Sequence, residues 1–264
     1  MLPTVVRVLD AERITPRTMR ITLGDVELEL PTADAYVKLF FPLQGQDIPS
    51  LAPPVAGDVV SWYRSYLAMP DNIRPPMRTY TVRANRPWLG EFDVDFVLHG
   101  DHGPGARWAS RARPGDAVAF LGPTGVHCVP TGTRWQLLVG DETAVPAIGS
   151  IIESAPAGSA VRAFIEADPA EWQRFSTAAN ADVQWVSDNL LDAVRAAPFT
   201  DGVYAWLAGE SAMVRAVRRH LVGERGIDRR VVTFTGYWRR GLSEEDVGRE
   251  GLRRIEAGLD PEEP

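Results

Sequence analysis

The sequence predicts a two-domain protein, in which an N-terminal antiparallel β-barrel precedes a C-terminal doubly wound α/β domain. The second domain is expected to have a mostly parallel sheet and a C-terminal helix. Short apolar or alternating runs separated by Gly and Pro fill the first half, which is typical of a closed barrel. After Gly122-Pro123-Thr124-Gly125, apolar strands alternate with helical stretches, which is typical of a doubly wound sheet. We place the boundary near residue 127, giving domains 1–127 and 128–264.

Composition excludes several classes of protein. The 264 residues are 45% hydrophobic, enough for a large core, and the net charge of -7 argues against a nucleic-acid-binding protein. Cys128 is the single cysteine, so one chain can form neither a disulfide framework nor a cysteine-ligated iron–sulfur cluster. The start lacks a secretory-signal pattern, and no apolar run approaches the roughly 18 residues of a membrane span. We therefore expect a cytoplasmic protein.

The strands expected in the first half are Val5 to Val8, Arg17 to Leu23, Tyr36 to Phe41, Asp58 to Tyr63, Arg78 to Ala84, Glu91 to His99 and Ala117 to Leu121. Residues 43–54 and 68–76 are expected to be loops. A helix is expected to start near Gly103-Pro104-Gly105. Glycines and a proline at a helix entrance let backbone N–H groups approach an anion. An ordinary strand-to-helix turn has the same composition, so both interpretations stay open.

The strands expected in the second half are Trp135 to Val139, Ala160 to Glu166, Val183 to Ser187, Tyr204 to Ala208 and Val231 to Thr235. The helices between them are expected at residues 147–152, 171–175, 190–196 and 211–222. Ligands of such sheets bind at the carboxyl ends of the strands. Those ends are expected at residues 140–143, 208–210 and 235–238.

The tail is expected to form a helix. Ser243 and Asp246 have the spacing of a capping box, and acidic residues fill the first turn. Gly258 lies near the expected stop. The apolar stripe of this helix is expected to consist of Val247, Leu252, Ile255 and Leu259.

The segment Arg78-Thr79-Tyr80-Thr81-Val82-Arg83 carries the most chemistry of any short stretch. On a strand, Arg78, Tyr80 and Val82 would share one face. A phenol can stack on a ring, and a guanidinium can form a fork of hydrogen bonds to a phosphate. The segment therefore suits a flat, phosphate-bearing ligand, although a polar strand near a sheet edge would have the same composition.

Six segments in this order resemble the siderophore-interacting proteins, a branch of the ferredoxin-reductase-like flavoproteins. They are residues 78–83, Asp95-Phe96-Val97-Leu98-His99-Gly100, Gly103-Pro104-Gly105-Ala106-Arg107-Trp108, Gly140-Asp141-Glu142-Thr143-Ala144-Val145-Pro146-Ala147, Ala208-Gly209-Glu210 and Gly236-Tyr237-Trp238-Arg239-Arg240-Gly241. The resemblance covers roughly residues 4–255. It implies a FAD-binding barrel and a second domain that binds a nicotinamide cofactor.

The resemblance also implies which residues hold FAD. The residues expected at the flavin and its phosphate chain are Arg78, Tyr80 and Thr81, with Arg83 close by. Val97 and His99 would lie along the cofactor. The pyrophosphate turn would contain Gly105, Ala106 and Trp108. His99 has a second interpretation, as an ordinary histidine at a strand end. We expect no metal site, because His99 and His102 lack a clear third ligand.

The nicotinamide site is expected at the strand ends of the second domain. The residues assigned there are Thr143, Ala144, Gly209, Glu210 and Trp238. Asp141 and Glu142 would repel a pyrophosphate placed directly on their turn, and helix capping by Asp141 or Thr143 is an equal alternative. Trp238 and Tyr237 could instead belong to the domain interface.

The choice between NADPH and NADH stays open. A 2′-phosphate needs a nearby arginine, and the sequence does not rank candidates such as Arg174 and Arg215.

The function implied by the resemblance is reduction of a ferric siderophore with electrons from NAD(P)H, which releases iron(II) because siderophores bind it weakly. A flavin suits this reaction, since it accepts an electron pair and passes electrons singly. No side chain is expected to act as acid or base in the iron step.

Many ferric siderophores are anionic, so basic residues near the carboxyl ends of the second sheet are expected to help docking. The candidates are Arg239, Arg240, Arg249, Arg253 and Arg254. A solvated tail whose arginines pair with Glu244, Glu245 and Glu250 is the alternative.

Two other functions stay open on the sequence. One is a general flavin-dependent reductase of another acceptor, and the other is a FAD- or siderophore-binding protein without turnover. A ferredoxin is a possible external electron donor. We expect a monomer with neither a nucleic-acid nor a membrane partner.

Overall fold

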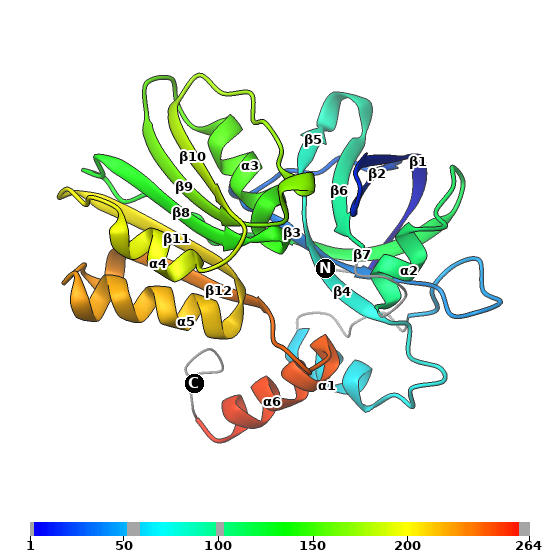
Figure 1. Cartoon of the computed structure of the whole chain (residues 1–264). Coiled ribbons are helices and arrows are strands. Elements are labelled where there is room, and N and C mark those ends of the chain that lie inside the picture. The colour runs from blue at the N-terminus through cyan, green and yellow to red at the C-terminus, as the bar shows by residue number, and fades with distance from the viewer. Residues whose placement is uncertain (1–2, 52–58, 99–102, 259–264) are drawn as a thin grey trace.

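The computed structural model describes residues 3–51, 59–98 and 103–258 (Figure 1). One antiparallel sheet comes from the first half of the chain and one parallel sheet from the second. The predicted two-domain fold class is therefore confirmed. The boundary predicted near residue 127 stays a prediction, and it falls in the connection between the two sheets.

The N-terminal sheet has the strand order β4-β3-β7-β1-β2-β6-β5. Its strands are β1 (Thr4–Thr15), β2 (Thr18–Gly24), β3 (Tyr36–Phe40), β4 (Met77–Thr81), β5 (Ala84–Arg86), β6 (Glu91–Val97) and β7 (Ala117–Thr124). The two edge strands, β4 and β5, are consecutive in the chain. Between them, the backbone N–H groups of Val82 and Arg83 donate to the carbonyls of Ala35 and Asp93. This link closes the curled sheet into a barrel around buried Phe and Val side chains.

The C-terminal sheet is entirely parallel, with the order β10-β9-β8-β11-β12. Its strands are β8 (Trp135–Asp141), β9 (Ala160–Glu166), β10 (Asn180–Val186), β11 (Val203–Glu210) and β12 (Val232–Trp238). The helices are α3 (Val145–Ser154), α4 (Leu190–Ala196) and α5 (Ser211–Arg219), which continues as a π-turn (His220–Glu224). α3 packs in one apolar cluster, and α4 and α5 pack in another on the opposite face. The strand order therefore reverses beside β8, where such folds place ligands.

One predicted strand is wrong. The described part of residues 58–63 belongs to helix α1 (Val59–Ala68). Trp62 and Tyr66 lie four residues apart and pack their rings on Phe40, at centroid distances of 5.8 and 5.5 Å. Residues at this spacing share one face of a helix, so burial of both rings favours the helix.

The helix predicted at residues 171–175 is also wrong. Only a 3₁₀ turn (Pro169–Glu171) forms there. Downstream of it, Trp172 and Phe175 stack on Trp185 at centroid distances of 6.1 and 6.2 Å. Both rings therefore pack on β10 from an irregular segment.

Helix α6 (Glu244–Glu256) has the predicted capping box between Ser243 and Asp246. Its predicted apolar stripe is wrong, because Val247 and Ile255 are exposed. Leu252 packs beside α1, and Glu245 is buried against β4. Leu259 lies outside the described residues. α6 therefore packs on the N-terminal domain (Figure 1), through a face that mixes one apolar residue with a carboxylate.

Candidate functional site

Tyr80 on β4 packs its ring against the barrel core. Its centroid lies 4.2 Å from that of Phe96 and 6.4 Å from that of Phe41. Gly105 comes so close that a Cβ atom on it would lie 2.0 Å from the Tyr80 hydroxyl, so a side chain there would force Tyr80 to move. Burial raises the pKa of the Tyr80 phenol above its ordinary value, so this group stays protonated at neutral pH.

Arg78 lies two residues earlier on β4 and forms an ion pair with Glu245 of α6. Its Nη1 lies 2.7 and 2.9 Å from the two carboxylate oxygens of Glu245. Glu244, the next acid on α6, accepts the backbone N–H of Thr79 at 2.9 Å. Among the described residues, the Nε and Nη2 groups of Arg78 donate no hydrogen bond to the protein. Arg78 thus keeps N–H donors available to a ligand even though α6 packs against β4.

The end of β4 contacts the second domain. Thr81 forms a side-chain hydrogen bond with Tyr237 of β12. Arg83 forms two hydrogen bonds with Glu153 of α3, at 2.7 and 3.0 Å, and its Nε is buried without a partner among the described residues. Arg83, which the resemblance places close to FAD, is therefore a residue of the domain interface in this structure.

The other residues expected at FAD are less clearly arranged. α2 (Pro104–Ala109) is only six residues long, and Gly105 and Ala106 are buried in it. The Trp108 ring packs on Phe41 and Phe96, at centroid distances of 5.3 and 5.8 Å. Val97 ends β6 and lines a small crevice with Pro146. His99, and with it the choice between its two interpretations, lies outside the described residues. A contact of these side chains with FAD stays a prediction.

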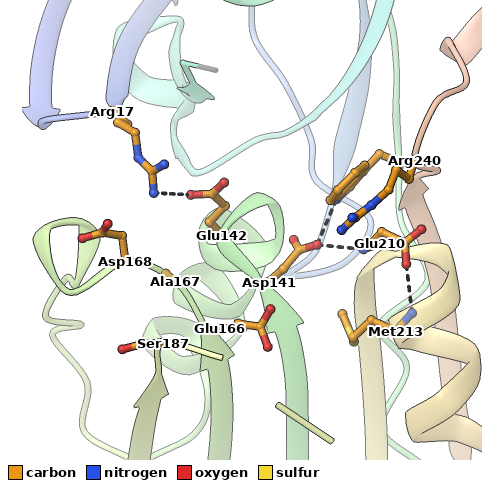
Figure 2. A pocket seen from close by; sticks show the side chains of 11 residues that line it. Arg17, Asp141, Glu142, Glu166, Ala167, Asp168, Ser187, Glu210, Met213 and Arg240 are labelled. Atoms are coloured by element: carbon orange, nitrogen blue, oxygen red, sulfur yellow. Dashed lines mark hydrogen bonds and ion pairs between the residues drawn. The ribbon is translucent and has the colours of Figure 1, made fainter. Parts of the chain in front are cut away.

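A cavity of about 280 Å³ lies at the carboxyl ends of the parallel strands (Figure 2). Its lining residues are Arg17, Asp141, Glu142, Glu166, Ala167, Asp168, Ser187, Glu210, Met213, Trp238 and Arg240. Arg17 comes from the turn between β1 and β2, so the barrel contributes one wall. The predicted site at the strand ends therefore coincides with a cavity. Glu210 and Trp238 line it, and their contact with a nicotinamide stays a prediction.

Asp141 joins the three strand ends at this cavity. Its Oδ1 accepts from the backbone N–H and the hydroxyl of Thr143, at 2.9 and 2.5 Å. Its Oδ2 accepts from the Glu210 backbone N–H at 2.7 Å and from the Trp238 Nε1 at 2.9 Å. The capping alternative is therefore correct for Asp141. Thr143 donates its hydroxyl to the protein itself, and Ala144 is fully buried, so their contact with a nicotinamide stays a prediction.

Gly209 makes this arrangement possible. Its φ of +131° is a conformation that side chains disfavour, and a Cβ there would lie 2.7 Å from the Asp141 carboxylate. The next residue, Glu210, caps α5 by accepting from the backbone N–H groups of Ala212 and Met213 at 2.6 and 3.0 Å. The segment 208–210 thus shapes the cavity wall through its backbone.

The five C-terminal arginines do not form one patch. Arg240 lines the cavity, whereas Arg249, Arg253 and Arg254 lie on α6, against the barrel rather than the second sheet. Ion pairs join Arg239 to Glu250 at 3.0 Å and Arg249 to Asp246 at 3.1 Å. The expectation that all five lie at the strand ends of the second sheet is therefore wrong for the α6 arginines.

Several residues of the site were not found from the sequence. Glu166 ends β9, Asp168 and Ser187 follow β9 and β10, and all three line the cavity. Glu245 reaches Arg78 across 167 positions of sequence. The position of Glu166 at a strand end was a usable signal. The position of Glu245 follows only from how α6 packs on β4, which no local pattern indicates.

The fold and the site define a flavoprotein of the ferredoxin-reductase class, with a barrel for the flavin and a parallel sheet for the nucleotide. Residues 7–127 match the family model described as the siderophore-interacting FAD-binding domain. Residues 133–241 match the model described as siderophore-interacting protein. The chain belongs to the siderophore-interacting protein family.

Named relatives cover nearly the whole chain. Ferric vibriobactin reductase ViuB of Vibrio cholerae is 32% identical over 256 residues, which are 90% of this chain and 91% of that protein. The NADPH-dependent ferric-chelate reductase of Escherichia coli is 30% identical over 244 residues, 88% of this chain and 91% of that protein. The crystal structure of a siderophore utilization protein from T. fusca is 33% identical, covers 91% of this chain and 94% of its own, and has a TM-score of 0.76.

The described residues fit FAD, which the family model assigns to the first domain. Among the described residues, the Nε and Nη2 groups of Arg78 donate to no protein acceptor and the buried Nε of Arg83 has no partner. Tyr80 provides an aromatic ring on β4, two residues from Arg78. In the part of the chain that the structure describes, no helix is both long and apolar enough to cross a bilayer.

Proposed function

We propose that this protein is a FAD-dependent reductase that takes electrons from a nicotinamide dinucleotide and reduces iron(III) in a siderophore, releasing iron(II). One observation carries the proposal. Arg78, Tyr80 and Thr81 lie on the strand that meets the second domain, and the same domain holds the cavity at its strand ends. The names of the relatives, ferric vibriobactin reductase and ferric-chelate reductase, support the choice of iron as the acceptor.

Bound FAD would supply the conversion from two-electron to one-electron chemistry. The protein's own residues bind and orient. The free N–H groups of Arg78 suit a diphosphate, because charge-assisted hydrogen bonds from a guanidinium fork are strong. The Tyr80 ring offers a flat apolar surface, and its phenol stays protonated. The side-chain hydrogen bond between Thr81 and Tyr237 joins the end of β4 to the second domain.

The cavity is the proposed nicotinamide site. Trp238 presents an indole ring whose orientation is fixed by its hydrogen bond to Asp141. Arg240 lines the same cavity and makes no ion pair with any described residue, so it is available to the diphosphate of a dinucleotide. Arg239, Arg249, Arg253 and Arg254 stay candidates for siderophore docking, through charges that face solvent.

The proposal also covers the electron donor, the oligomeric state and the cellular location. We expect a monomer, which size-exclusion chromatography with light scattering tests. A ferredoxin could replace the dinucleotide as donor. We expect the cytoplasm as location, because the proposed dinucleotide donor is kept there.

The test is an anaerobic absorption titration of the full chain loaded with FAD. We expect a flavin spectrum that bleaches on adding a dinucleotide and returns on adding a ferric siderophore, with iron(II) captured by a chromogenic chelator. A protein that does not bind FAD would contradict the proposal. Faster turnover of quinones or free flavin than of ferric siderophores would identify a general reductase instead. Bound flavin that no donor bleaches would identify a binding protein.

A further inference from the structure

Four carboxylates of the protein itself cap helical turns that begin at the cavity. One of them, Asp168, accepts from the Ala170 N–H at 2.9 Å in the 3₁₀ turn Pro169–Glu171. Asp141 accepts from the Thr143 N–H at 2.9 Å, and Glu210 accepts from the first turn of α5. Glu166 accepts from the N–H of Leu190, the first residue of α4, at 3.0 Å. Helix N-termini are the usual places where phosphates bind in such folds. Here these positions are already satisfied by negative charge.

The charge of the cavity lining also disfavours an additional phosphate. Its titratable groups are the five carboxylates of Asp141, Glu142, Glu166, Asp168 and Glu210 and the two guanidinium groups of Arg17 and Arg240. Arg17 is already paired, at 3.1 Å with Glu142 and at 3.8 Å with Glu171. Neither Arg174 nor Arg215, the sequence candidates for a 2′-phosphate partner, lines the cavity. Among the described residues that line the cavity, Arg240 is the one guanidinium left to meet a phosphate.

Glu166 occupies an informative position. It ends β9, the second strand of the β8–α3–β9 unit. In nucleotide-binding folds, an acid near this point accepts a hydrogen bond from the adenosine ribose 2′-hydroxyl, and enzymes that use the 2′-phosphorylated form need an arginine nearby. At the ends of β9 and β10, the cavity is lined by Glu166, Ala167, Asp168 and Ser187, none of which is basic.

From this geometry, and resting on the proposed function, we propose that the electron donor is NADH and that the cavity rejects NADPH. Glu166 accepts from a ribose hydroxyl of the adenosine half, and Arg240 faces the diphosphate. A 2′-phosphate adds about −1.5 to −2 charge at pH 7. At the ends of β9 and β10 it would meet the carboxylates of Glu166 and Asp168, because Arg17 is paired with Glu142 and Arg240 faces the diphosphate. The E. coli relative is named as NADPH-dependent, so the proposal separates this chain from it.

The experiment measures two quantities on the full chain loaded with FAD. The first is kcat/KM for flavin reduction by each dinucleotide, measured anaerobically. The second is the dissociation constant of NAD⁺ and of NADP⁺ by calorimetry, which does not depend on turnover. We expect NADH to be favoured at least tenfold in both, which corresponds to about 1.4 kcal/mol.

Two variants test whether the residues at the ends of β9 and β10 determine the preference for NADH. Glu166→Gln keeps a carbonyl oxygen to cap Leu190 but removes the charge, and we expect the NADH preference to fall at least threefold. Ser187→Arg adds a guanidinium at the end of β10, and we expect it to raise kcat/KM for NADPH at least tenfold. Asp192→Asn is the matched control, because Asp192 lies on the exposed side of α4 and removes one charge away from the cavity.

Equal use of both dinucleotides, or a preference for NADPH, would overturn the proposal. So would binding of neither. The proposed function is tested separately, by reducing the bound flavin with dithionite and adding a ferric tris-catecholate. If iron(II) then forms although neither dinucleotide binds, the reductase function stands and only the NADH inference is lost. If dithionite-reduced protein leaves iron(III) unchanged, the reductase function itself fails.

Discussion

Glu245 at the start of α6 places both carboxylate oxygens within 2.9 Å of one guanidinium nitrogen of Arg78 on β4. Glu245 is only 7% exposed, so water screens this pair weakly. Beside it, Glu244 approaches Lys38 at 3.3 Å. α6 therefore pairs its acids with Arg78, which the family resemblance assigns to the flavin, and with Lys38 on the neighbouring strand β3. We therefore predict that a FAD diphosphate and the acids of α6 compete for the positive charge of Arg78.

The first prediction concerns this competition. Glu245→Gln should tighten FAD binding by about three- to tenfold, because it removes a negative charge next to the phosphate partner. Arg78→Ala should weaken FAD binding by about 10- to 100-fold, because a charge-assisted hydrogen bond contributes about 1.5–3 kcal/mol. Flavin fluorescence titration of the apoprotein measures both. Glu250→Gln on the same helix is the control and should leave binding unchanged. Weaker binding by Glu245→Gln would mean that Glu245 orients Arg78 instead.

Asp141 should be the costliest carboxylate to remove from the cavity. Asp141→Ala leaves the Trp238 and Glu210 N–H groups without their acceptor, and we expect a loss of about 2–4 kcal/mol in the free energy of unfolding. Urea denaturation measures it, with Asp192→Ala as the control that should change stability by less than about 0.5 kcal/mol. An equal loss in both variants would contradict the role of Asp141 in joining the strand ends.

Gly209 and Gly158 separate backbone strain from steric contact. Both have positive φ, but a Cβ on Gly209 would meet the Asp141 carboxylate whereas a Cβ on Gly158 would meet nothing within 4 Å. We expect Gly158→Ala to cost about 1 kcal/mol and Gly209→Ala at least about 2 kcal/mol, with weaker dinucleotide binding only in the latter. Equal costs in thermal denaturation would show that the close approach at Gly209 relaxes freely.

Asp93 makes the barrel sensitive to acid. Burial alone would raise the pKa of the Asp93 carboxyl, but hydrogen bonds from Arg86 at 2.6 and 2.8 Å and from Thr22 at 2.9 Å outweigh it and lower the pKa. The folded state therefore disfavours protonation. The contribution of the Asp93 carboxylate to the free energy of unfolding is fully present above the pKa of about 4 that it has in the unfolded chain. It is lost as the pH falls through the lower pKa of the folded state.

Chemical denaturation between pH 7 and pH 2.5 tests this effect. The free energy of unfolding should fall below about pH 4 in the native protein, and by about 1–3 kcal/mol less in Asp93→Asn, which is already less stable at pH 7. Parallel curves for the two proteins would show that other carboxylates cause the acid sensitivity.

Much of the fold could be predicted because local patterns determine it. Strand β9 and helix α4 form over the predicted residues, since apolar strands and capped helices of the second domain have clear periods. Helix α1 was missed because its aromatic residues form strands equally well, and only packing on Phe40 favours the helix.

Some positions in the site could likewise be predicted from the sequence, whereas others depend on tertiary packing. Trp238 and Glu210 lie at the strand ends that the sequence predicts, because a parallel sheet brings these ends together, and their contact with a nicotinamide stays a prediction. The ion pair between Glu245 and Arg78 could not be predicted, because it depends on how α6 packs on α1 and β4. The arginines of α6 were misplaced for the same reason. A charge in a tail reaches a site only through tertiary packing, which has no sequence period.

The most direct test of the whole account is the return of the flavin spectrum when iron is added. The protein loaded with FAD is reduced anaerobically with one equivalent of NADH and then mixed with a ferric siderophore. The account predicts that the oxidised flavin absorbance returns and that about two iron(II) ions appear per flavin, because a flavin carries two electrons. A flavin that stays reduced in the presence of the iron complex, with no iron(II) formed, would contradict it.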